Sequence, residues 1–142
     1  MKYTFPVTKE MVKARSTLSV SKIHAHTVCK AINKKKFKEA KEIIEGLASE
    51  KTPLGKRFYT KTSSELLKFL NILESNAGAK NLDPNEMNLF ISVHRGPTLM
   101  RSRRKWRFGR EMKICHVQAI LKGEKSGTGK KVHSTVNKKS SN

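Results

Sequence analysis

The sequence has few acidic residues, few cysteines and no long apolar run, and each shortage argues against a class of protein. Its 142 residues contain 11 aspartates and glutamates against 31 lysines and arginines. A two-metal nuclease needs clustered carboxylates, and no such cluster occurs. The two cysteines, Cys29 and Cys115, make no disulfide framework, and no apolar run approaches the ~18 residues of a membrane span. We therefore expect a soluble, intracellular, reduced protein.

The sequence has a large excess of positive charge, with a net charge of +20. Charge of one sign repels itself in a compact chain, so a polyanion is expected to neutralise it. Nucleic acid is the favoured partner. An anionic membrane surface is the alternative, and it is disfavoured because the amphipathic stripes of the chain are already used as core.

Three stretches show the apolar spacing of helices that bury one face. They cover residues 22–33, 37–47 and 62–79. Ser21 is a candidate N-cap for the first helix. Thr62 and Glu65 have the spacing of a capping box, which predicts that the third helix begins there.

Other stretches predict strands. Residues 1–20 are extended in character, residues 88–94 alternate between apolar and polar, and residues 114–121 form a further strand. From residue 122 onward the chain is rich in lysine and poor in apolar side chains, so it cannot bury enough surface to order itself. We expect one domain over residues 1–121 and a disordered basic tail over 122–142.

The connection between the last two strands, residues 95–113, is too long for an ordinary hairpin loop. It holds eight basic residues and one acid, Glu111, for a net charge of +7. If the strands continue outward, the two arms form a ribbon that projects about 25 Å. A lone two-stranded ribbon is not stable in water. We therefore expect residues 95–113 to order only against an anionic partner.

Two rings, Trp106 and Phe108, lie among these cations. Arginine guanidinium groups bind phosphates through two parallel hydrogen bonds, and aromatic rings stack on unpaired bases, so RNA is the predicted ligand. The alternative is a solvated loop whose Trp106 covers part of the core. Gly109 predicts a tight turn or a close backbone approach, and Gly96-Pro97 a bend where the ribbon leaves the sheet. The candidate RNA-binding residues of the hairpin are Arg95, Arg101, Arg103, Arg104, Lys105, Trp106, Arg107, Arg110 and Lys113.

Two motifs that resemble reactive sites fail on geometry. His24 and His26 are two positions apart on a helix, so they point roughly 200° from each other and cannot share a metal ion. Cys115 and His116 are neighbours in a strand and face opposite sides of the sheet, so they cannot form a nucleophile–base dyad. We predict no catalytic residue, no metal site and no cofactor.

Five segments carry a resemblance to a known family when their order and spacing are taken together. They read SKIHAHTVCKAI at 21–32, KKFKEAKEIIEGL at 35–47, SSELLKFLNILESNAGAKNLD at 63–83, FISVHRGPTLMRSRRKWRFGR at 90–110 and ICHVQAIL at 114–121. Over about residues 16–124 the chain resembles the universal large-subunit ribosomal protein that lines the nascent-peptide exit tunnel, numbered twenty-two in bacteria and seventeen in eukaryotes.

The resemblance implies an α+β fold of three helices on a three-stranded antiparallel sheet, with a long protruding basic β-hairpin. In this family the body lies near the tunnel exit, the hairpin passes between ribosomal RNA domains, and its tip forms part of the tunnel wall. Lys22 would meet RNA phosphate. The implied partners are large-subunit ribosomal RNA, neighbouring large-subunit proteins and the nascent polypeptide, with no membrane and no homo-oligomer. The implied location is the cytoplasmic ribosome, with nucleolar assembly in a eukaryote.

The chain departs from the family pattern in two places. Cytosolic eukaryotic members carry a long insert between the second and third helices, where this chain has only about residues 52–62. The segment between Gly109-Arg110 and Cys115-His116 is also about four residues shorter.

A free-standing RNA- or DNA-binding regulator is the alternative function, because it has the same electrostatics without a fixed assembly.

Overall fold

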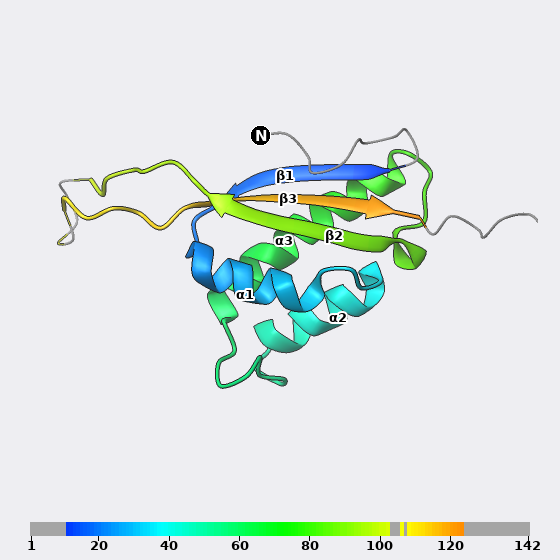
Figure 1. Cartoon of the computed structure of the whole chain (residues 1–142), viewed down its shortest axis with the longest axis horizontal. Coiled ribbons are helices and arrows are strands. Elements are labelled where there is room, and N and C mark those ends of the chain that lie inside the picture. Colours follow the sequence, from blue (N-terminus) through cyan, green and yellow to red (C-terminus); the bar gives the residue numbers. More distant parts are fainter. Residues whose placement is uncertain (1–10, 103–105, 107, 124–142) are drawn as a thin grey trace, which may run out of the picture.

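The computed structural model describes residues 11–102, 106 and 108–123, and these fold into a sheet with helices packed on one side (Figure 1). The α+β fold that the resemblance implied, with three helices and a three-stranded antiparallel sheet, is confirmed. None of the described helices is long and apolar enough to cross a membrane. Several predictions fall outside the described residues, namely those for residues 1–10, for Arg103, Arg104, Lys105 and Arg107, and for the tail from 124.

The sheet has the order β1-β3-β2, so the last strand in the sequence lies at its centre. The strands are β1 (Val12–Leu18), β2 (Asn88–Arg95) and β3 (Cys115–Lys122). β3 pairs antiparallel with both neighbours, which places Ala119 opposite Ala14 and Ile91. All three side chains are buried. Alternate residues of every strand therefore face the helices and form one side of the core.

The helices lie close to the predicted ranges. They are α1 (Lys22–Ile32), α2 (Phe37–Ala48) and α3 (Thr60–Gly78), and a short 3₁₀ turn, Pro84–Glu86, lies between α3 and β2. Ser21 is the N-cap residue of α1, as predicted, but its side chain makes no capping hydrogen bond. The buried stripes match the predicted periodicity and consist of Ala25, Val28, Cys29 and Ile32 on α1, Phe37, Ala40, Ile44 and Leu47 on α2, and Leu66, Phe69, Leu70, Leu73 and Ala77 on α3.

The predicted capping box at the start of α3 is wrong. The helix begins two residues earlier, after Tyr59, whose backbone is left-handed with a φ of 53°. Thr62 lies inside the first turn and is buried, while the Glu65 carboxylate accepts a hydrogen bond from the Lys68 ammonium at 2.9 Å. The turn at Tyr59 redirects the chain into the helix, so packing against the body, rather than a hydroxyl cap, sets where α3 starts.

The hairpin leaves the sheet with a change of register. The Gly96 amide donates to the Ile114 carbonyl at 3.1 Å, which continues the β2–β3 ladder. Farther out, Met100 pairs with Glu111, so the outgoing arm has four steps where the returning arm has three. One extra residue on one strand is a bulge. Pro97 lies in this interval and has no amide hydrogen to donate, which is tolerated at a bulge or on an edge strand such as β2.

Beyond the bulge the arms are not continuous strands. Among the described residues they are joined by the Arg101 amide donating to the Arg110 carbonyl at 3.1 Å and the Met112 amide donating to the Leu99 carbonyl at 2.7 Å. Gly109 has a φ of +76°, which fits the predicted tight turn, whereas a Cβ atom there would have no described neighbour within 4 Å, so the alternative of a close backbone approach is not found. Figure 1 shows the connection extending past the end of the sheet.

Gly96 is required by close packing at the root of the hairpin. A Cβ atom there would lie 2.7 Å from Cγ2 of Ile114 and 2.9 Å from its backbone carbon and oxygen. We predict that Gly96→Ala destabilises the protein by about 1–3 kcal/mol, as overpacking does. Gly78→Ala is the matched control, because a Cβ atom at Gly78 would have no neighbour within 4 Å. Urea unfolding of both variants measures the difference, and equal stability would contradict the close approach.

Candidate nucleic-acid interface

Exposed apolar side chains concentrate on the hairpin. The Trp106 side chain is 84% exposed and that of Phe108 57%. Leu99 and Met100 are also exposed, so four of the seven exposed large apolar side chains among the described residues lie in this segment. The alternative that Trp106 covers the core is therefore wrong. A cluster of exposed apolar groups is typical of an interaction surface.

The described cations of the hairpin are Arg95, Arg101, Arg110 and Lys113, against a single carboxylate, Glu111. Arg95 and Glu111 form an ion pair at 3.8 Å, and both side chains are more than half exposed. An exposed pair of this kind contributes little to stability. The hairpin therefore presents cations and rings together on one exposed segment, which is the arrangement that phosphate binding and base stacking require.

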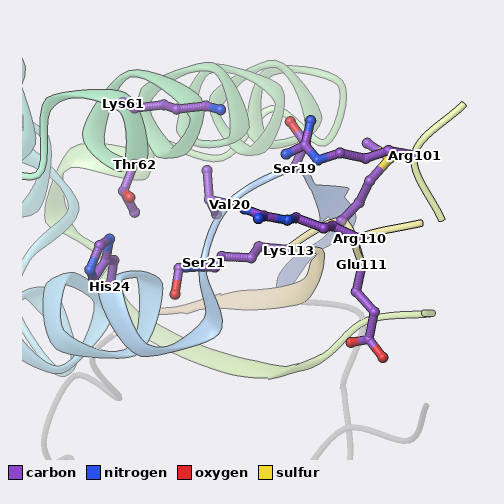
Figure 2. Close-up of a pocket in the computed structure, with 11 residues that line it drawn as sticks. Ser19, Val20, Ser21, His24, Lys61, Thr62, Arg101, Arg110, Glu111 and Lys113 are labelled. Atoms are coloured by element: carbon purple, nitrogen blue, oxygen red, sulfur yellow. The ribbon is translucent and has the colours of Figure 1, made fainter. Parts of the chain in front are cut away.

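A groove of about 540 Å³ lies between the root of the hairpin and the first turns of two helices. We call it the root groove. It is lined by residues 19–21 and His24 at the start of α1, by Lys61 and Thr62 at the start of α3, and by Arg101 and residues 110–113 of the hairpin arms. Figure 2 shows Arg110 and Lys113 extending from the hairpin toward Val20 and Ser21.

The root groove contains some of the predicted RNA-binding residues and not others. Arg101, Arg110 and Lys113 are brought together there, whereas Arg95 and Lys22 do not line it. Lys22 is the exposed first residue of α1, next to the lining residue Ser21.

Sequence reasoning missed Lys61. It is separated from the hairpin by about 40 positions in the sequence, so only the tertiary fold brings it to the same groove. One local signal was present: Lys61 is the second residue of α3. A cation near a helix N-terminus is unfavourable unless an anion or another partner offsets it.

A smaller set of polar groups lies beside a second hollow, of about 480 Å³, that Arg15, Thr17 and His116 help to line. The Thr17 hydroxyl and Nδ1 of His116 are 2.9 Å apart, within hydrogen-bond distance. Among the described residues, Arg15 is the one lysine or arginine that lines this hollow, so it is a weaker candidate for a polyanion than the root groove.

Comparison with protein families gives the assignment. The model of the family described as ribosomal protein L22p/L17e matches residues 13–123. The chain belongs to this family. It is a structural constituent of the large ribosomal subunit. A search of curated proteins gave no match.

The residues matched to the L22p/L17e family include the candidate interface. Both hairpin arms, the root groove and all three helices lie within 13–123, whereas most of the basic tail lies outside it. The family is structural and not enzymatic.

The two cysteines of this L22p/L17e protein are held as neutral thiols in the core. Burial raises the pKa of Cys29 from its ordinary value of 9.0 to about 12, and the nearby Cys115 thiol contributes to the rise. Burial also raises the pKa of Cys115. His116 faces the other side of the sheet, where Thr17 is its partner, so the predicted geometry that separates Cys115 from His116 is confirmed. No set of three potential metal ligands occurs within the described part of the chain.

We predict that both thiols react with a disulfide reagent at pH 8 at least tenfold more slowly in the folded protein than in urea, because the thiolate is the reactive species. The raised pKa also predicts how stability depends on pH. The unfolded chain deprotonates first, so the stabilisation from the neutral thiols is complete below about pH 9 and is lost as the pH rises toward 12. Equal labelling rates in the folded and unfolded protein would contradict the burial of these groups.

Proposed function

We propose that this member of the L22p/L17e family binds large-subunit ribosomal RNA through its hairpin and contributes to the wall of the nascent-peptide exit tunnel. The observation that carries the proposal is the exposure of Trp106 and Phe108 among cations, on a segment that extends past the sheet. Stacking of RNA bases on these rings in the assembled subunit would explain why they are exposed in the free protein.

The cations and the rings have separate roles in this proposal. Arg101 and Arg110, together with Arg103, Arg104, Lys105 and Arg107, neutralise phosphates and release their counterions. Trp106 and Phe108 stack on bases that ribosomal RNA leaves unpaired in its tertiary fold. Lys22, at the exposed start of α1, and Arg95 and Lys113 at the hairpin root add further phosphate contacts.

The remaining partners follow from the same position in the subunit. The hairpin would contact the nascent polypeptide where it reaches the tunnel, and the body would contact neighbouring large-subunit proteins near the tunnel exit. The chain would act as a monomer on cytoplasmic ribosomes, after nucleolar assembly if its source is a eukaryote. The net charge of +20 supports RNA as the main partner, because a polyanion offsets the self-repulsion of the chain.

Stacking and charge neutralisation differ in their salt dependence, which gives a test of RNA binding. We predict that Trp106→Ala weakens binding to large-subunit ribosomal RNA fragments by about 1–3 kcal/mol without changing the slope of log affinity against log salt, because stacking displaces few ions. Trp106→Phe, which keeps a ring, should retain most of the affinity. Binding titrations at several salt concentrations measure both quantities.

The thermal midpoint of the free variants is the control for this prediction. Since Trp106 is exposed, neither substitution should lower the midpoint by more than a degree or two. If Trp106→Ala leaves RNA affinity unchanged, the ring does not stack on RNA and the proposed role of the hairpin is wrong.

A further inference from the structure

Cations from two separate parts of the fold meet in the root groove. Lys61 comes from the start of α3, and Arg101, Arg110 and Lys113 come from the hairpin arms. Among the ion pairs formed by the described residues, none involves these four side chains. Like charges held around one space repel each other unless an anion occupies it. The groove is therefore suited to an anionic ligand.

The single carboxylate of the lining does not neutralise this charge. Figure 2 shows the Glu111 side chain pointing away from the space into which Arg110 and Lys113 extend. Its carboxylate instead pairs with Arg95, at 3.8 Å. An anion in the groove therefore meets several cations without a carboxylate directed at it.

Backbone donors of two helices add to the positive potential. α1 and α3 both begin at the groove, and neither has a side-chain hydrogen bond at its N-cap residue, Ser21 or Tyr59. The first N–H groups of a helix lack acceptors within the helix and carry the positive end of its dipole. They reinforce the side-chain cations, which remain the main evidence.

The groove is larger and less polar than a simple phosphate site. Its volume of about 540 Å³ lies in the range of ~300–1,000 Å³ that small-ligand pockets occupy. The half-buried Met112 contributes apolar surface beside the nearly buried Val20, and the hydroxyl-bearing residues Ser21 and Thr62 also line it. An inorganic anion gains nothing from contact with the apolar surface, whereas the sugar and base of a nucleotide can pack against it.

We propose that the root groove holds one nucleotide of an RNA strand, with its phosphate between Lys61 of the body and Arg101 and Arg110 of the hairpin. The strand thereby ties the hairpin to the body and fixes the direction in which the hairpin projects. The inference rests on the proposed RNA-binding function and names the site at which the body takes part. The covalent path into the hairpin passes through the bulge after Gly96, so a second connection limits bending there.

Lys61→Gln tests the body side of the groove, and Lys38→Gln is its matched control. Both lysines are exposed and each is the second residue of its helix, so both changes remove one charge at the same position relative to the helix dipole. Only Lys61 lines the groove. With a labelled single-stranded RNA and the whole chain, Lys61→Gln should reduce the salt slope by about 0.7, the value for one phosphate contact on a single strand. Lys38→Gln should leave the slope unchanged.

The outcomes separate this inference from the proposed function. If Lys61→Gln and Lys38→Gln give equal salt slopes while Trp106→Ala still weakens RNA binding, the proposed nucleotide site in the root groove is wrong. The proposal that the hairpin binds RNA would still stand. A wild-type chain that does not bind RNA would instead overturn the proposed function. Inorganic phosphate should displace the RNA only at far higher phosphate concentration than a competing RNA strand. If polyglutamate displaces the RNA as effectively as a competing RNA strand does, the ligand of the groove is not a nucleotide. The groove would then bind an acidic protein.

The tie between hairpin and body has its own readout. Spin labels at Ser102→Cys on the hairpin and Ser75→Cys on α3 report the distance between them, since both positions are exposed and the native thiols are buried. RNA should narrow the distance distribution in the otherwise wild-type chain and leave it broad with Lys61→Glu. If RNA narrows the distance distribution equally in Lys61→Glu, or if the distribution is already narrow without RNA, then RNA in the groove does not connect the hairpin to the body.

Discussion

The pairing of β3 with two neighbours at once is the interaction on which the rest of the structure depends. β3 pairs with β1 along one edge and with β2 along the other, and its Val117 and Ala119 side chains form part of the core. The same strand is the continuation of the returning hairpin arm. Because a twisted, fully paired central strand is hard to displace, the sheet holds the root of the hairpin. Folding of the body and presentation of the hairpin thus share one element.

The distribution of charge is the second constraint. The apolar stripes of the helices are buried in the core, and this burial keeps the body folded despite a net charge of +20. Cations outnumber carboxylates at the root groove and among the described residues of the hairpin, where Glu111 is the single acid and pairs with Arg95, so an external anion can reach the others. In the large subunit, ribosomal RNA supplies that anion in our account. The free protein would then be strained electrostatically where the assembled protein is neutralised.

Local features of this fold could be predicted from the sequence, and features that join distant segments could not. The helical stripe of α1 and the alternation of β2 are local periodicities, and both elements end within a residue of their predicted limits. The bulge near Pro97 depends on which residue lies opposite, and Lys61 reaches the groove only through tertiary packing. Thr62 shows the opposite failure, because a buried hydroxyl in the first turn has the sequence pattern of a cap. Arg101, Arg110 and Lys113 were predicted because they cluster in the sequence.

Retention in the large subunit after a high-salt wash tests the central claim most directly, namely that the hairpin holds this protein on ribosomal RNA. The informative comparison is between the whole chain and a variant in which Asn-Gly replaces residues 97–113. That turn suits a two-residue hairpin between Gly96 and Ile114, which already pair. On sucrose gradients the whole chain should sediment with large subunits, and the shortened variant should fold but remain at the top. Equal retention of the two would contradict the account.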